Sequence, residues 1–242
     1  MTNELWDRRV AAGYDAASAE MFSDDVLGPT VDFLAPLAER GRTLELAIGT
    51  GRVALALRAR GVDVHGIDSS PSMVEQLRAK PGGDTIPVTI GDMATARVAG
   101  TFALVYLVYN TITNLLTQDE QVACFCNASA HLDAGGSFVI EVFVPSLRRL
   151  PVGERFVPFD VTPGHIGVDE FDVANQRLIS HHFFVGDGRG DTFDSPHRYA
   201  WPAEYDLMAR IAGLTRRERW SNWHRDPFTS ESTSHISVWR KP

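Results

Sequence analysis

The sequence has little cysteine and no long apolar run, and each absence excludes a class of protein. Cys124 and Cys126 are the only cysteines among 242 residues. Their spacing on a predicted helix points them to different faces, which suits neither a disulfide nor a metal clip. No apolar stretch approaches the ~18 residues of a membrane-spanning helix, and the N-terminal residues lack the apolar core of a signal peptide. We therefore expect a cytoplasmic protein without a membrane partner.

Basic side chains are also scarce, because 23 Lys and Arg face 31 Asp and Glu, for a net charge of −8. A chain of this charge is a poor binder of nucleic acid, since neutralising phosphates requires clustered Lys and Arg. The sequence contains no His, Asp and Glu at metal-ligand spacing and no Gly-x-Ser-x-Gly elbow. We expect no metal and no serine nucleophile. The expected partner is a small molecule, bound by a monomer or a homodimer.

Strand-like and helix-like segments alternate along the first part of the chain. After helices over residues 5–17 and 24–40, the pattern predicts strands at 43–48, 62–67, 85–90, 102–108 and 137–144. Helices are predicted between them, at 52–60, from Ser70-Pro71 onward, and from Thr117 to about residue 132 with Glu120 completing a capping box. Such alternation indicates right-handed βαβ units, and hence an α/β fold with a doubly wound sheet and helices on both faces.

The pattern changes after Pro145. Residues 154–201 favour β structure, with turn signals at 174–175 and 186–188. They are few and have little apolar surface of their own, so we expect an antiparallel β insertion and not a separate domain, and we expect it to cover the binding pocket. A helix at 202–212 and strands at 214–223 and 235–240 follow. We expect one domain over residues 1–242, with residues 1–40 as a helical lid.

A glycine loop, Gly49-Thr50-Gly51, joins the first strand of the sheet to the next helix. Its spacing fits G-x-G-x-x-A, and Asp68, followed by Ser69, ends the next strand, where a carboxylate could hold a ribose. Both a nicotinamide dinucleotide and S-adenosylmethionine would suit such a loop. Glu45 favours the second, because an anion repels a pyrophosphate but attracts a sulfonium and an ammonium group. Alternatively, Glu45 caps backbone amides of the turn.

The third strand of the sheet ends in another acidic residue, Asp92, followed by Met93. Asp92 is placed to accept a hydrogen bond from the amino group of adenine, although an Asp after a strand also commonly caps a turn. Met73 could cover an adenosine or pack beneath its own helix. We expect Asp68 and Asp92 to converge on one crevice at the carboxyl ends of the strands.

Four segments in this order and spacing, LELAIGTGR, GIDSSPSMV, IGDM and AGGSFVIEVF, resemble the class I S-adenosylmethionine-dependent methyltransferases over residues 44–144. The resemblance implies a seven-stranded, mostly parallel sheet whose last strand, 235–240, is antiparallel. It also implies the cofactor contacts. The methionine part is surrounded by the loop residues Glu45, Ala47, Gly49, Thr50 and Gly51; the ribose, adenosine and adenine are contacted by Asp68, Ser69, Met73, Asp92 and Met93; and Val108 lies near the methyl group.

The methyl acceptor is expected at Tyr109-Asn110, after the fourth strand, where VYNTITNL resembles N-methyltransferases that act on glycine and on amino sugars. Asn110 could instead only cap a turn. Tyr14, in AAGYD, resembles the tyrosine of a mobile lid that closes over the sulfonium. An amine acceptor is favoured because a neutral amine needs no strong base.

Three alternatives remain open at this point. An O-methyltransferase would use a histidine base, for which His181 or His182 in the insertion is a candidate, although on a strand at most one of them faces inward. An NAD-dependent oxidoreductase would use the same glycine loop, and Glu45 is the residue that disfavours it. A non-catalytic protein could bind S-adenosylmethionine only as a sensor.

Overall fold

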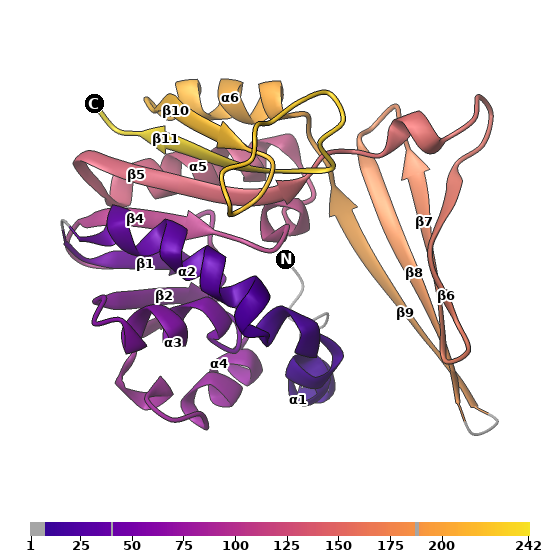
Figure 1. Cartoon of the computed structure of the whole chain (residues 1–242), viewed down its shortest axis with the longest axis horizontal. Helices are drawn as coiled ribbons and strands as arrows, with labels where there is room; N and C mark the ends of the chain where they lie inside the picture. The colour runs from indigo at the N-terminus through magenta and orange to yellow at the C-terminus, as the bar shows by residue number, and fades with distance from the viewer. Residues whose placement is uncertain (1–7, 40, 187–188) are drawn as a thin grey trace.

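The computed structural model describes residues 8–39, 41–186 and 189–242, which form two β-sheets with flanking helices (Figure 1). The larger sheet has seven strands in the order β10-β11-β5-β4-β1-β2-β3. These are β1 (Thr43–Leu46), β2 (Val64–Asp68), β3 (Val88–Ile90), β4 (Phe102–Leu107), β5 (Leu132–Phe143), β10 (Thr215–Trp220) and β11 (Ser234–Arg240).

The strand directions confirm the predicted sheet. The strands β1 to β5 pair in parallel, whereas β11 runs antiparallel to both of its neighbours, β5 and β10. Every residue of β1 and β4 is buried. These are central strands of a sheet covered on both faces, which explains why the sequence of β4 is a continuous apolar run with little alternation.

The helices cover the two faces of this sheet (Figure 1). One core cluster joins the sheet to α5 (Gln118–His131) and α6 (Pro202–Ile211), and a second joins it to α2 (Asp24–Ala38) and α3 (Arg52–Ala59). The remaining helices are α1 (Arg8–Ala17) and α4 (Pro71–Arg78). None of the helices in the described part of the chain is both long and apolar enough to cross a membrane.

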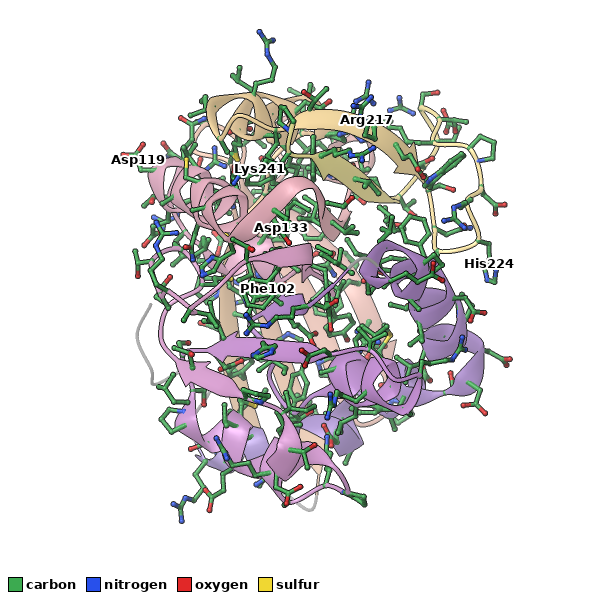
Figure 2. All side chains as sticks on the ribbon, turned by 90° about the vertical axis from the view of Figure 1, so that its left-hand side faces the viewer. Phe102, Asp119, Asp133, Arg217, His224 and Lys241 are labelled. Atoms are coloured by element: carbon green, nitrogen blue, oxygen red, sulfur yellow. The ribbon has the colours of Figure 1, made fainter. Side chains whose placement is uncertain are left out.

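The predicted helix caps are present. Thr117 and Glu120 form the capping box of α5, in which each side chain accepts a hydrogen bond from the other residue's amide. Ser70 caps α4 by accepting from the amide of Met73 at 3.2 Å. Figure 2 shows how the side chains fill the space between sheet and helices. Phe102 lies fully buried among the strands, whereas exposed residues such as Asp119 lie at the periphery.

The second sheet is the predicted antiparallel insertion. Its strands, in the order β6-β7-β8-β9, are β6 (Phe156–Thr162), β7 (His165–Asp172), β8 (Arg177–Gly186) and β9 (Arg189–Arg198). The predicted turn at 174–175 joins β7 to β8, whereas the turn predicted at 186–188 lies partly outside the described residues. The strand predicted at 214–223 ends earlier, at Trp220, because hydrogen bonds between Ser221 or Asn222 and Asp226 turn the chain back.

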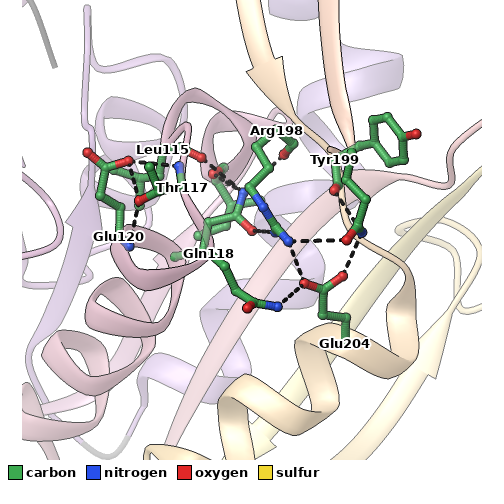
Figure 3. Close-up of polar contacts among 10 residues, drawn as sticks. Leu115, Thr117, Gln118, Glu120, Arg198, Tyr199 and Glu204 are labelled. Atoms are coloured by element: carbon green, nitrogen blue, oxygen red, sulfur yellow. Dashed lines mark hydrogen bonds and ion pairs between the residues drawn. The ribbon is translucent and has the colours of Figure 1, made fainter. Parts of the chain in front are cut away.

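A buried polar network attaches the insertion to the larger sheet's helices (Figure 3). Arg198, at the end of β9, is 5% exposed and donates to Gln121 of α5 and to Glu204 of α6, each at 2.6 Å. Glu204 also accepts from Gln118 and Gln176. Since Gln176 lies in the turn between β7 and β8, the network joins the insertion to two helices at once.

Candidate active site

A cavity of about 860 Å³ lies where the two sheets approach each other. Its volume falls within the roughly 300–1,000 Å³ usual for small-molecule sites. Three parts of the chain line it: the ends of the parallel strands with the segments that follow them (including the start of α4), helix α1 and one face of the insertion. From the first come Ala47, Gly49, Asp68, Ser69, Met73, Met93, Tyr109 and Asn110. Most of the predicted site residues are therefore brought together at one cavity.

The glycine loop turns tightly at the end of β1. Gly49 and Gly51 have φ angles of +56° and +81°, a region that L side chains rarely adopt. A Cβ at Gly51 would lie 2.2 Å from Cδ1 of Leu77, so the loop packs directly against α4. Ala47 shares the left-handed conformation, at φ +53°, although it carries a Cβ. The loop thus presents backbone to the cavity.

Asp68 lies beside this loop at the end of β2 and is 7% exposed. Its Oδ2 accepts from the amide of Gly49 at 2.6 Å, and its Oδ1 accepts from the amide of Ser70 at 2.8 Å. Burial raises the pKa of this carboxyl, while the two amide hydrogen bonds lower it. Each carboxylate oxygen keeps a further lone pair, so Asp68 can accept from a pair of hydroxyls. With the apolar Met73 and Met93 on the same wall, this region fits a nucleoside.

Glu45 does not reach the cavity wall in the described structure. It is 4% exposed, and its Oε2 accepts from the hydroxyl of Tyr106 at 2.7 Å. Burial raises its pKa to about 8, although the hydrogen bond from Tyr106 and the charge of Arg52 both lower it. The group is therefore largely protonated at neutral pH, and the negative charge that favoured a cationic ligand is mostly absent. The backbone of Ala54, in α3, also lowers the pKa of Glu45, and capping of the turn by Glu45 stays a prediction.

Other predicted cofactor residues also lie off the wall of the cavity, as far as the described residues show: Thr50, Gly51, Asp92 and Val108. Asp92 accepts from the amide of Ala94 at 2.7 Å, which is the turn-capping role that the sequence left open. Thr50 donates its hydroxyl to Asp15 at 2.6 Å. A direct contact between these residues and the cofactor stays a prediction.

Tyr109 and Asn110 follow β4 and are both left-handed, with φ of 58° and 61°. Such a conformation costs about 1–3 kcal/mol for a residue with a side chain and persists only where the surroundings hold it. Here β5 holds it: the amide of Tyr109 donates to Glu141 at 3.0 Å, and Oδ1 of Asn110 accepts from the amide of Phe143 at 2.8 Å. The side-chain amide nitrogen of Asn110 keeps its donors available at the cavity.

Helix α1 brings Tyr14 to the same cavity. Burial, followed by the nearby Tyr109, raises the pKa of Tyr14 to about 12, so it stays a neutral phenol. The next residue, Asp15, forms an ion pair with Lys80 as well as the hydrogen bond with Thr50, and Lys80 also donates to the carbonyl of Thr50 at 2.8 Å. The sequence carried no signal for this contact, which fixes α1 to the glycine loop.

One face of the insertion supplies the rest of the wall. The polar side chains of the insertion on the cavity are Asp169, Ser180, His182, Asp191, Thr192, Ser195 and His197. The sequence analysis missed Asp169 and Ser180. Ser180 lies two residues before His182, and residues two apart on a strand share a face, so this spacing was a usable signal. Ser180 donates to Asp169 at 2.7 Å, and burial raises the pKa of Asp169.

The histidines of the insertion take different positions. His197 contacts Thr113 through Nδ1 and Ser195 through Nε2, each at 3.0 Å, and burial lowers its pKa to about 4, which keeps it neutral. His182 lines the cavity, whereas His181 contacts Asp194 at 2.8 Å on the opposite face. This confirms that only one of the adjacent pair faces inward.

No cluster of three or more His, Cys, Asp or Glu side chains suitable for a metal occurs among the residues that the structure describes.

Comparisons with known proteins agree with this geometry. A family model described as a methyltransferase domain matches residues 43–136. The structure of the CcbJ methyltransferase from Streptomyces caelestis superposes with a TM-score of 0.80 and 36% identity, over 88% of each chain. A cypemycin N-terminal methyltransferase from a Streptomyces species is 26% identical over 97% of this chain and 96% of its own. A sugar N-methyltransferase from a Streptoalloteichus species shares the fold, with a TM-score of 0.67 and 19% identity, over 95% of this chain and 93% of its own.

Proposed function

Because this chain belongs to the class I S-adenosylmethionine-dependent methyltransferases, we propose that it methylates an amine nitrogen of a small molecule. The observation that carries the choice of an amine is the charge of the cavity wall. Among the described residues that line it, Asp68, Asp169 and Asp191 stand against one basic residue, Arg9. Both cavity histidines have lowered pKa values and stay neutral. An acidic wall favours a cationic acceptor over an anionic phenolate.

The residues at the carboxyl ends of the parallel strands would hold the cofactor. Asp68 would accept from the ribose hydroxyls, Met73 and Met93 would contact the adenosine, and the backbone of the glycine loop would approach the methionine part. S-adenosylmethionine supplies a methyl group already activated on a sulfonium sulfur. The protein therefore has to orient the reactants and exclude water, and orientation alone is worth ~7–11 kcal/mol of the barrier.

The acceptor would lie between Asn110 and the insertion. In this proposal, the Nδ2 donors of Asn110 and the neutral hydroxyl of Tyr14 position the acceptor, and Tyr109 closes the wall beside the methyl group. Residues 1–40 act as a lid, because α1 covers the cavity and is tied to the glycine loop through Asp15. Residues 154–201 act as the roof. The name of the curated N-terminal methyltransferase refers to a peptide amine, and this supports a nitrogen acceptor here.

The experiment is a turnover assay with S-adenosylmethionine against matched sets of acceptors. One set contains aliphatic amines, amino sugars and peptides with free N-termini, and the other contains phenols of similar size. We expect methylation of amines and little or none of phenols. Methylation of phenols alone would favour O-methylation, with His182 as the base on the wall.

The cofactor site has a separate test by calorimetry. The wild type should bind S-adenosylmethionine and not NAD, and Asp68→Ala should abolish binding because it removes the acceptor of the ribose hydroxyls. Asp133→Ala, an exposed aspartate on β5, is the matched control and should bind as the wild type does. Unchanged affinity in Asp68→Ala would contradict the assigned role.

A further inference from the structure

A β-bulge in β6 places two consecutive side chains on the cavity side of the insertion. Pro158 pairs with Val168 and Asp160 with Gly167, so Phe159 is an extra residue between the two pairs. Such a bulge re-aims side chains that would otherwise alternate. Gly167 accommodates it, because a Cβ there would lie 2.3 Å from the ring of Phe159. Phe159 thus lines the cavity, and Asp160 reaches the neighbouring strand.

Asp160 begins a chain of contacts that ends at the cavity. Its Oδ2 contacts Nδ1 of His165 at 2.5 Å, and Nε2 of His165 contacts Nδ1 of His182 at 3.0 Å. The two rings are stacked, with centroids 5.1 Å apart and planes 18° from parallel. His182 lines the cavity, whereas Asp160 and His165 are not among the described residues that line it.

The carboxylate determines where the protons of both rings lie. Asp160 accepts from Nδ1 of His165, so in the tautomer with a single ring proton Nε2 of His165 is left as an acceptor. His182 must then donate from Nδ1, which leaves its own Nε2 with a free lone pair. An aspartate orients a histidine base in hydrolytic triads by the same logic.

We propose that His182 is the proton acceptor for the methyl acceptor, with His165 and Asp160 as positioning residues, and that the substrate enters as an ammonium ion. This deepens the proposed function and rests on it. In the step, one N–H bond of the ammonium breaks and one N–H bond forms at Nε2 of His182. The positive charge moves from the substrate to the histidine pair, and the nitrogen is left with the lone pair that it needs as a nucleophile.

The surroundings of His182 suit this role. The rings of Phe159 and Phe193 lie 5.3 and 5.8 Å from its ring. The charged and titratable groups around it are His165 on β7, Asp160 on β6, His181 on its own strand, and Asp194 and His197 on β9. Burial and then His165 lower the pKa of His182, so the ring is unprotonated and able to accept at neutral pH.

The first test needs no acceptor and reads the proton positions directly. Nitrogen-15 NMR of the full chain should show His182 protonated on Nδ1 and not on Nε2. In Asp160→Asn this preference should be lost, since an amide can donate to His165 and reverse the order. A wild-type His182 protonated on Nε2 would overturn the proposal.

The second test is the pH dependence of kcat/KM with S-adenosylmethionine and the best amine of the turnover assay. The wild type should be nearly independent of pH between about 7 and 9, because it binds the ammonium form. His182→Gln should lose about 10²-fold at pH 7 and recover tenfold per pH unit, since only the free amine then reacts. In His165→Gln and Asp160→Asn, kcat/KM should rise with pH in the same direction, and the loss of kcat/KM at pH 7 should be smaller than in His182→Gln.

His181→Gln is the matched control, because this neighbouring histidine faces outward and contacts Glu170 and Asp194. It should behave as the wild type does. Equal pH profiles for wild type and His182→Gln would overturn the role of His182 as proton acceptor. A wild type that methylates phenols and no amine would instead refute the proposed function. Binding of S-adenosylmethionine by each variant shows that a loss of rate is not a loss of folding.

Discussion

Ala47 and Gly49 share nearly the same backbone conformation, with φ of 53° and 56°, but only Ala47 carries a Cβ. A left-handed residue with a Cβ costs roughly 1–2 kcal/mol. Ala47→Gly should therefore raise the free energy of unfolding by up to about 1 kcal/mol. The gain is smaller than the full cost of the strain because glycine also increases the entropy of the unfolded chain. Gly49→Ala should lower it by about 1–2 kcal/mol.

Urea denaturation measures both changes. A Cβ at Gly49 would have no neighbour nearer than 3.7 Å, so the expected loss comes from the backbone and not from a collision. Destabilisation by both variants would show that the conformation of Ala47 carries no strain.

Glu45 predicts a pH dependence of stability. Its pKa rises from 4.5 to about 8 on folding because the carboxyl is buried beside Tyr106. Between these two values the folded chain binds a proton that the unfolded chain has lost, so stability falls as pH rises through this window, by roughly 1 kcal/mol per pH unit. Glu45→Gln removes this contribution and should flatten the profile.

The measurement is urea denaturation at pH 5, 6, 7 and 8, compared between wild type and Glu45→Gln. The difference between the two profiles isolates this group from the other titrating side chains. Tyr106→Phe removes a hydrogen bond that lowers the pKa of Glu45, so its profile should keep falling to a higher pH than that of the wild type. Parallel profiles for all three proteins would contradict the assigned protonation.

At the scale of elements, helix α1 is fixed to the glycine loop through Lys80, which pairs with Asp15 and donates to Thr50. Lys80→Met keeps the length of the side chain but removes both contacts. We expect faster amide hydrogen exchange in α1 and several-fold weaker binding of S-adenosylmethionine, with little change in Tm, because Ala11 is the one buried residue in the described span of α1.

Glu75→Gln is the control for this prediction. It removes the exposed ion pair of Glu75 with Arg8, which also joins α1 to α4 but lies in solvent, where such pairs contribute little. Its exchange rates should match those of the wild type. Slow exchange in Lys80→Met would mean that α1 is held by its packing alone.

The elements themselves were largely predictable from the sequence. The capping residues Thr117 and Ser70 fixed two helix starts, and the apolar run from Phe102 fixed the central strand, because these signals are local. Local signals failed at β10, where contacts between Asn222 and Asp226 end the strand. They also gave no indication of the contact of Asp15 with Lys80, which are 65 residues apart in the chain.

The candidate site was predicted unevenly for the same reason. Asp68 follows a strand whose register places it at the cavity, and the structure has it there. Glu45 was interpreted from its charge, and its protonation depends on Tyr106, which reaches it from another strand. The position of Asp160 depends on a β-bulge in the pairing of β6 with β7. The periodicity of the sequence does not reveal an extra residue of this kind.

At the scale of the whole molecule, Arg198 and Glu204 hold the roof of the cavity against the helices. Removing one partner of a buried pair leaves an uncompensated charge and costs about 3–5 kcal/mol. Glu204→Ala should lower the unfolding free energy by about this amount and raise the KM for the acceptor more than that for S-adenosylmethionine. Gln118→Ala, which loses only one hydrogen bond to Glu204, should change neither by much. Equal rises in the two KM values would show that the network does not position the roof.

The separation of the two walls has a consequence for how such an enzyme diversifies. In the proposed function, cofactor contacts come from the ends of the parallel strands, whereas the acceptor wall comes from residues of three adjacent strands, including Asp169, Ser180 and Ser195. Substitutions at these positions leave the strand pairing to the backbone and to the outward-facing side chains. Asp169 and Ser180 form a hydrogen bond with each other, so these two positions have to be varied together. A combinatorial library at these positions should yield new acceptor preferences while inheriting the methyl donor unchanged.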